Sequence, residues 1–261
     1  MSDFRIDQIT NQAGTAGPDI AGITTFSGSS GLLMPRGDTR GRYSGVDGEI
    51  VKDGLVLWLD AGRAESYGGD GTTWRDLSGN GNNGTLVNGV GFSAEEGGSL
   101  IFDGSDDFIE TTYTPGNISS QTISCWINKS NLQYSLILAK STLYYGLEIY
   151  PTIIYVNITN TQYGQVSYNT NGWQNIVFTY DGNQTGNSNR LKIYFNGDVQ
   201  TLTFSGTIPS SANVSDVIQI GRRWWASRFS EGSIAQVSVY NRALSAAEIT
   251  QNYNALKGRY T

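Results

Sequence analysis

The chain has 261 residues, of which 38% are hydrophobic, and it carries 23 acidic residues against 17 Lys and Arg. This length allows one large β-domain with an appendage or two small domains, and the apolar content is enough for a buried core. The net charge of −6 argues against general binding to nucleic acids or anionic membranes, because phosphate contacts need clustered Lys and Arg.

Cysteine and histidine usage excludes further classes of protein. The single cysteine, Cys125, has no intrachain disulfide partner, and its apolar neighbours predict a small buried side chain rather than a nucleophile. The absence of histidine removes the commonest general base and metal ligand. No stretch has the pattern of a secretory signal or the length of a transmembrane helix.

Residues 1–50 differ in composition from the rest of the chain. Scattered apolar side chains stand among Gly, Ser and Thr, with a spacing that fits neither a helix nor a sandwich strand. Such an extended arm buries too little to offset its chain entropy, so we expect it to order on a partner chain or on copies of itself. The anchoring residues expected are Phe4, Ile6, Ile9, Ile20, Ile23, Phe26, Arg36, Arg40 and Arg42. For the three arginines, solvated charge is the alternative interpretation.

From Leu55 onward, β-type runs alternate with loops rich in Gly and Asn, which indicates two packed antiparallel sheets over residues 51–261. Asn196-Gly197 predicts a two-residue hairpin turn, because both central residues of a type I′ turn need positive φ. The strands are predicted at 55–60, 99–103, 107–112, 121–128, 134–140, 145–150, 153–158, 164–168, 173–181, 190–196, 199–204, 216–221 and 233–240.

The last predicted strand is followed by a turn and a short helix. Strict alternation in the strand predicts one face with Ala235, Val237 and Val239, and the other with Ile234, Gln236, Ser238 and Tyr240. Ser245 followed by Glu248 is a capping box, which marks the start of a helix. The apolar residues after it recur at helical spacing, so one helix face can dock on a sheet.

This closing stretch carries a family resemblance. The motif Phe229-x-x-Gly232-x-Ile234-x-x-Val237-x-Val239-Tyr240-Asn241-Arg242-Ala243-Leu244-Ser245-x-x-Glu248-Ile249 resembles the end of laminin-G-like domains in the concanavalin A-like jelly-roll superfamily. Other segments that look similar are 55–61, 76–85, 100–104, 173–182 and 191–197. The resemblance implies an all-β, two-sheet antiparallel jelly roll with a short C-terminal helix. It implies no single function, because unrelated activities share this scaffold.

A second resemblance concerns the arm. Residues 4–38 are similar to leader segments of structural proteins from marine tailed phages, notably those of cyanobacteria. This implies a non-enzymatic virion protein of decoration, accessory or tail-fibre type, whose partners are other virion proteins or copies of itself. The alternative is a glycan-binding module for host adhesion, and a hydrolase is the third hypothesis.

Catalysis is disfavoured by missing residue patterns. Glycoside hydrolysis needs two carboxylates flanking one bond, and the E-x-D-x-E strand motif of the superfamily's glucanases does not occur. Glu148 stands alone in its strand, and Glu95 and Glu96 are adjacent in a loop. Serine, threonine and cysteine nucleophiles lack a histidine base.

A calcium site is the one cofactor candidate. Asp103, Asp106 and Asp107 offer three carboxylates within five residues, and Asp60 and Asp76 are candidate distant partners. The alternative, which the pattern favours, is a turn between two strands whose Asp side chains accept local backbone N–H groups.

An arginine and tryptophan motif, Arg222-Arg223-Trp224-Trp225, is the candidate for glycan or partner binding. Exposed indoles stack on sugar rings, and Arg bonds hydroxyls or carboxylates. Core packing and a protein interface rank above glycan binding, because adjacent residues alternate faces. Further aromatic surface is expected from Tyr144, Tyr145, Tyr150, Tyr155, Tyr163 and Tyr168.

Overall fold

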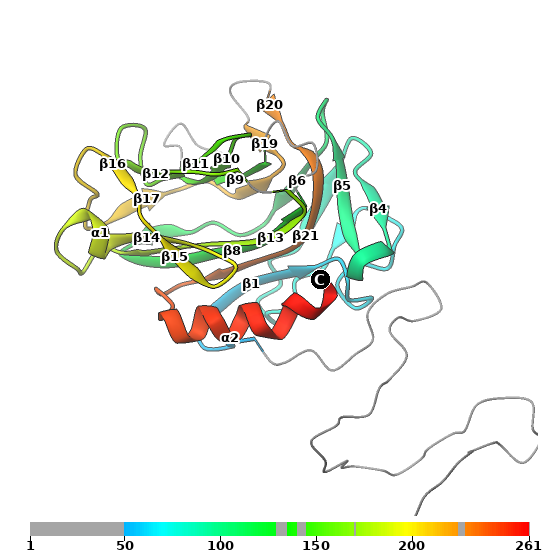
Figure 1. Cartoon of the computed structure of the whole chain (residues 1–261). Helices are drawn as coiled ribbons and strands as arrows, with labels where there is room; N and C mark the ends of the chain where they lie inside the picture. The colour runs from blue at the N-terminus through cyan, green and yellow to red at the C-terminus, as the bar shows by residue number, and fades with distance from the viewer. Residues whose placement is uncertain (1–49, 129–134, 140–144, 170, 224–227, 261) are drawn as a thin grey trace, which may run out of the picture. The chain divides into compact units, whose positions relative to one another are not determined.

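The computed structural model describes residues 50–128, 135–139, 145–169, 171–223 and 228–260. Two antiparallel sheets are stacked within them (Figure 1). Sheet A has the order β15-β14-β13-β8-β21-β5-β4, with β1 also paired to β21. Its strands are β1 (Leu55–Asp60), β4 (Gly91–Ser93), β5 (Ser99–Asp103), β8 (Ser120–Asn128), β13 (Trp173–Asp181), β14 (Leu191–Phe195), β15 (Asp198–Gln200) and β21 (Glu231–Tyr240).

Sheet B has the order β16-β12-β11-β10-β9-β18-β6-β3-β2. Its strands are β2 (Thr73–Trp74), β3 (Gly84–Val87), β6 (Phe108–Thr111), β9 (Ser135–Ala139), β10 (Gly146–Ile149), β11 (Ile153–Asn157), β12 (Tyr163–Ser167), β16 (Thr203–Ser205) and β18 (Ile218–Ile220). Two small pairs stand apart: β7 (Gly116–Ile118) with β17 (Ala212–Val214), and β19 (Arg222–Arg223) with β20 (Arg228–Phe229). The short helices are η1 (Glu95–Gly97), α1 (Asn187–Arg190), α2 (Ala246–Leu256) and η2 (Lys257–Arg259).

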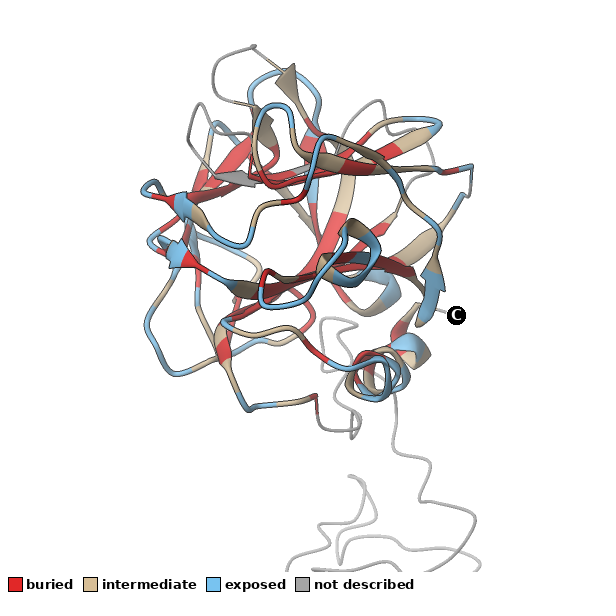
Figure 2. Cartoon of the chain, turned by 90° about the vertical axis from the view of Figure 1, so that its left-hand side faces the viewer, coloured by how far each residue is buried: buried red, intermediate tan, exposed pale blue. Residues whose placement is uncertain are grey.

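The main core lies between the two sheets. Leu57 and Phe178 from sheet A and Leu147 and Ile154 from sheet B are among its fully buried side chains. Buried residues run along the strands of both sheets, while exposed ones gather in the loops (Figure 2). Cys125 belongs to this core, where burial raises the pKa of its thiol to about 12. The prediction that Cys125 is buried is therefore confirmed.

A second apolar cluster joins α2 to the outer face of sheet A, below it in Figure 1. Trp126 of β8 stacks on Tyr253 and Tyr260, with ring centroids 5.7 and 4.4 Å apart. Ile249 and Leu256 of the helix are buried in the same cluster. The expected docking of one helix face on a sheet is confirmed, and it accounts for the buried aromatic residues on this side of sheet A.

The predicted face pattern of the closing strand is wrong at its start. Ile234 packs in the main core with Val237 and Val239, whereas Ala235 faces the α2 cluster. The cause is a register shift of β21 against β8 between Ile234 and Gln236, a β-bulge that exchanges the faces on either side of it.

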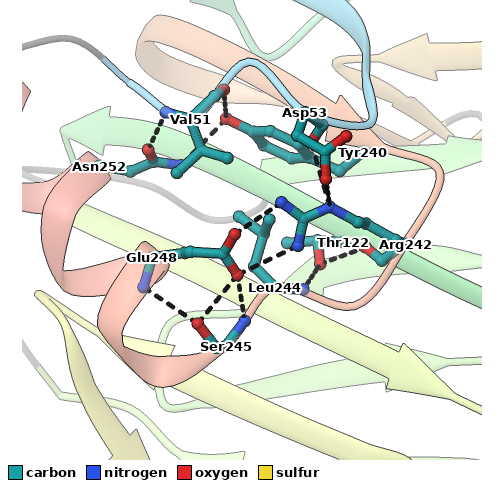
Figure 3. Close-up of polar contacts among 9 residues, drawn as sticks. All are labelled: Val51, Asp53, Thr122, Tyr240, Arg242, Leu244, Ser245, Glu248 and Asn252. Atoms are coloured by element: carbon teal, nitrogen blue, oxygen red, sulfur yellow. Dashed lines mark hydrogen bonds and ion pairs between the residues drawn. The ribbon is translucent and has the colours of Figure 1, made fainter.

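The start of α2 is fixed by a polar network around Arg242 (Figure 3). The Ser245 hydroxyl accepts from the Glu248 N–H, and the Glu248 carboxylate accepts from the Ser245 N–H, so the predicted capping box is present. The Arg242 guanidinium donates to both carboxylate oxygens of Glu248, at 2.6 and 3.1 Å, and pairs with Asp53. The network therefore ties the turn before α2 to the chain preceding β1.

The predicted two-sheet antiparallel sandwich and its C-terminal helix are confirmed. Asn196 and Gly197 have φ values of 52° and 91° and join β14 to β15, as the hairpin signal predicted. Several short strands were not predicted, namely β2, β3, β4, β7, β17, β19 and β20. The single strand predicted at 199–204 is wrong: β15 and β16 lie there, and they belong to different sheets. In the described part of the chain, no helix combines the length and apolarity needed to cross a bilayer. The arm's anchoring residues lie outside the described residues.

We predict a pH-dependent contribution from Glu248. Its hydrogen bonds with Arg242 lower its pKa to about 2, so its stabilising effect is complete above pH 4.5 and is lost as the pH falls towards 2. Glu248→Gln keeps an acceptor for the cap but removes the charge. Urea unfolding should show the variant less stable by roughly 1 kcal/mol at pH 7, a value discounted for solvent screening, with the difference shrinking below about pH 4.5.

The exposed Glu65→Gln substitution controls for the change in net charge. A stability difference between wild type and Glu248→Gln that stays constant from pH 7 to pH 3 would contradict the assignment.

Candidate functional site

The outer face of sheet B carries a pocket of about 400 Å³, which we call the tyrosine pocket. This volume falls within the ~300–1,000 Å³ typical of ligand sites. Its lining residues are Glu148, Tyr150, Tyr155, Asn157, Asn160, Tyr163, Arg223 and Arg228. They come from β10, β11, β12, the adjoining loops and the hairpin of β19 and β20.

Strand alternation explains why polar side chains meet on this face. Leu147 and Ile149 point into the main core, so Glu148 between them points outward. The register pairs Glu148 with Tyr155 on the next strand. Asn157 and Tyr163 are paired in the same way between β11 and β12. This part of the face is thus built from three consecutive strands whose outward residues share a register.

An ion pair holds the edge of the tyrosine pocket next to the β19–β20 hairpin. The Arg223 guanidinium lies 2.6 Å from a Glu148 carboxylate oxygen, and both side chains are nearly buried. Tyr150 donates to the other oxygen at 3.2 Å and accepts from Arg228 at 3.0 Å. Burial raises the pKa of Glu148, although Arg223 opposes this shift. Two arginines and one glutamate therefore give the pocket a positive balance.

Three tyrosines form the aromatic part of the pocket. Tyr155 meets Tyr150 and Tyr163 edge to face, with ring centroids 5.5 Å apart in both pairs. All three side chains are partly exposed. Edge-to-face contacts of this kind favour one arrangement of the rings, so the aromatic surface is preorganised.

Asn157 is the anomaly of the pocket. It is only 6% exposed, and its amide nitrogen has no hydrogen-bond partner among the described residues. A buried amide without a partner costs free energy, and such groups are rare in folded proteins. The side chain lines the pocket, so a ligand acceptor there would satisfy it.

A second group of polar residues, the aspartate loop at 103–107, joins β5 to β6. Carboxylate oxygens of Asp103, Asp106 and Asp107, one from each, all lie within 4.8 Å of one another. Asp103 accepts from the Ser105 N–H, which lowers its pKa, and Asp107 accepts from the Asp103 N–H. The predicted local turn is therefore present. Burial raises the pKa of Asp107.

Comparison with known proteins assigns the sequence to a family. Residues 103–250, more than half of the chain, match the laminin G family described as the Concanavalin A-like lectin/glucanases superfamily. The chain belongs to this superfamily. The match includes most of the tyrosine pocket's strands and the closing motif from which the resemblance was first drawn. No curated protein matches the sequence.

Solved structures with the superfamily's fold include binding domains of botulinum neurotoxins. One, from neurotoxin DC in complex with rat synaptotagmin II, has a TM-score of 0.59 and 16% identity over 79% of this chain and 52% of its own. A structure of neurotoxin type C, whose cell entry depends on two ganglioside molecules, has a TM-score of 0.56 and 18% identity over 78% of this chain and 52% of its own. This chain spans about half the length of these domains, and at such identities the likeness shows the fold alone.

The structure brings together part of the predicted binding motif. Arg223 lines the tyrosine pocket, whereas Arg222 lies over the Phe108 ring at 4.7 Å, outside it. Trp224 and Trp225 lie outside the described residues, as does Tyr144. Of the other predicted surface aromatics, Tyr145 and Tyr168 are buried in the main core, which corrects the expectation that they add aromatic surface.

The candidate distant partners of a calcium site have other roles. Asp60 is fully buried and accepts from Arg259 at 2.8 Å. Asp76 accepts from the Trp58, Ser78 and Asn82 N–H groups and shapes its own loop. Neither belongs to the described aspartate cluster, so the expectation that they complete it is wrong.

The two glutamates in the strands of sheet B, Glu110 and Glu148, are not neighbours. The register from Glu110 through Gln219 and Leu138 to Gly146 places Glu110 three strands away from Glu148. Three spacings of about 4.8 Å give roughly 14 Å between their backbones. Carboxylates that flank one glycosidic bond lie about 5–9.5 Å apart. These two glutamates therefore do not form the pair that glycoside hydrolysis requires.

A larger pocket, of about 550 Å³, lies beside the start of α2 on sheet A. Its lining includes Arg242, Ser245 and Glu248, whose polar groups are engaged in the helix cap. None of its described lining residues has a buried polar atom without a partner. The tyrosine pocket is the better candidate, because the Asn157 amide in its lining has no hydrogen-bond partner among the described residues.

We predict that Asn157 lowers the stability of the domain, because its buried amide nitrogen has no hydrogen-bond partner among the described residues. Asn157→Leu should leave the free energy of urea unfolding unchanged or raise it, because an unsatisfied buried amide is replaced by an apolar group. The matched control is Asn175→Leu, since buried Asn175 donates to the Cys125 carbonyl at 3.1 Å. That control should lose about 1–3 kcal/mol. Equal losses in both variants would show that the Asn157 amide is satisfied.

Proposed function

We propose that the domain is a non-catalytic binding module that holds a glycan in the tyrosine pocket. The observation that carries the proposal is the buried Asn157 amide, which lacks a partner among the described residues in a pocket with three preorganised tyrosines. A glycan hydroxyl or carbonyl oxygen would accept from this amide.

The chemistry of the pocket fits a sugar better than an apolar ligand. Tyrosine rings offer apolar surface for the C–H faces of a sugar, and their hydroxyls exchange hydrogen bonds with sugar hydroxyls. The lining also carries Arg223 and Arg228, which donate to hydroxyls or to a carboxylate. Glu148 accepts hydrogen bonds, so donors and acceptors are both present.

The fold neighbours support the same class of function. Cell entry of neurotoxin type C depends on interaction with two ganglioside molecules, and a ligand-binding domain of neurotoxin serotype D forms a complex with N-acetylneuraminic acid. These fold neighbours are binding domains, which also favours recognition over catalysis for this chain.

The proposal predicts selective loss of glycan binding. The full chain is applied to a glycan array, and the strongest glycan is titrated by calorimetry. Tyr155→Leu and Asn157→Leu should each weaken binding by about tenfold or more, which corresponds to ~1.4 kcal/mol per lost contact. Lys192→Ala, in the large pocket beside α2, is the control and should bind as wild type.

If the wild-type protein binds no glycan on the array with calcium present, the proposal is overturned. Equal weakening in the Lys192→Ala control overturns it as well, because it would place binding elsewhere on the domain.

A virion location is a second proposal, and it is supported by the leader-like sequence of residues 4–38. In this proposal the arm at 1–50 anchors the chain to other virion proteins or to its own copies, and the domain at 51–261 displays the pocket. Deleting residues 1–42 should leave a folded domain with unchanged glycan binding that no longer joins particles. Normal incorporation of the truncated chain, measured by its copy number in purified particles, would contradict the anchoring role.

A further inference from the structure

The β19–β20 hairpin meets sheet B at one buried carboxylate. Arg223 of β19 lies 2.6 Å from a Glu148 oxygen, and only 13% and 4% of the two side chains are exposed. Tyr150 donates to the other Glu148 oxygen and accepts from Arg228 of β20. Glu148 therefore contacts one strand of the hairpin directly and the other through Tyr150, so it joins both pocket arginines to sheet B.

Glu148 is the one acidic residue among the described residues that line the tyrosine pocket. The charged or titratable groups that face it are Tyr150 from the loop after β10, Tyr155 from β11, Arg223 from β19 and Arg228 from β20. Leu136, opposite Glu148 on β9, carries no charge. If Glu148 loses its charge, no second carboxylate of the pocket lining takes over the contact with the arginines.

Few groups of this chain change charge in mild acid. The sequence has no histidine, the side chain that ordinarily titrates there. Burial raises the pKa of Glu148 above its ordinary 4.5, although Arg223 opposes this shift, and among the described residues Asp107 is the other carboxyl whose pKa is raised. A raised carboxyl pKa gives stability that is complete below pH 4.5 and is lost as the pH rises through the raised pKa. The charged Glu148 therefore costs stability at pH 7, which points to a role in geometry.

We propose that Glu148 is a positioning residue: its carboxylate fixes Arg223 and Arg228 for the ligand, and its protonation in mild acid weakens glycan binding. A proton taken from solvent turns the carboxylate into a neutral acid, so the hairpin loses its ionic contact with sheet B. The effect on glycan affinity rests on the proposed function of the tyrosine pocket, whereas the positioning of the hairpin does not.

The pH profile of glycan binding is measured by calorimetry on the full chain with the strongest glycan of the array. At pH 4.5 more than half of Glu148 is protonated in the free protein, so the affinity should be less than half of its value at pH 7. Glu148→Gln carries no charge at any pH. It should bind about tenfold or more weakly than wild type at pH 7, with no further fall towards pH 4.5. A wild-type affinity that is constant between pH 7 and pH 4.5 would overturn the proposal.

The matched control is Glu110→Gln. Glu110 belongs to the same sheet, three strands from Glu148, and accepts from the Gln219 amide at 2.7 Å. This variant should keep the wild-type affinity at pH 7 and the fall in acid. If the fall persists in Glu148→Gln, another group such as Asp107 titrates, and the assignment to Glu148 is overturned.

Hydrogen exchange at pH 7 tests the positioning role without a glycan. The Ser230 N–H donates to the Gly221 carbonyl at 2.8 Å, at the base of the hairpin. Glu148→Gln should speed exchange of this amide by about tenfold, because the hairpin opens locally more often, and Glu110→Gln should leave it unchanged.

The Tm separates positioning from a general loss of stability. Glu148→Gln should have a Tm equal to or above that of wild type at pH 7, because a neutral side chain removes the cost of burying a charge. Unchanged exchange at Ser230 would overturn the positioning role. A Tm below that of wild type would overturn it too, since Glu148 would then serve the stability of the whole domain. These readouts use no glycan, so their failure is distinguishable from failure of the proposed glycan function.

Discussion

A buried ion pair between Asp60 and Arg259 joins the first strand of sheet A to the last turn of the chain. One guanidinium nitrogen lies 2.8 Å from each carboxylate oxygen, and both side chains are almost completely buried. Two charges taken out of water are tolerated only while their geometry is kept, so this contact fixes where η2 ends. Tyr260 follows directly and stacks on Trp126, which holds α2 against sheet A. No helix of the described residues packs on the outer face of sheet B in this way, and polar residues of that face line the tyrosine pocket.

Local patterns in the sequence predict most of the fold because they act over a few residues. Alternation identifies the long strands, Asn196-Gly197 identifies a hairpin turn, and Ser245 with Glu248 identifies the helix start. The β-bulge after Ile234 escapes prediction, because it depends on pairing with β8, more than a hundred residues away. Strands of two to four residues, such as β2 and β3, also escape, since their partners in the sheet and not their own residues define them.

The candidate site is less accessible to sequence reasoning. Arg223 is predicted because it stands in a motif, and three tyrosines of the pocket are predicted as surface aromatics. Asn157 carries no local signal: its importance comes from burial without a partner, which appears only when β10, β11 and β12 are in register. The Asp107 carboxylate is similar. Its spacing favours a turn over a metal ligand, and its carboxylate oxygen without a partner among the described residues is visible only in the structure.

Two hydrogen bonds that hold the backbone of Val51 have a mechanical consequence. Its N–H donates to the Asn252 side chain at 2.8 Å, and its carbonyl accepts from the Tyr240 hydroxyl at 3.0 Å (Figure 3). Tyr240 belongs to β21, which is paired on both sides within sheet A. Val51 and the tyrosine pocket lie on opposite outer faces of the sandwich. A force applied to the chain at Val51 would therefore load a central strand of sheet A instead of peeling away an edge strand.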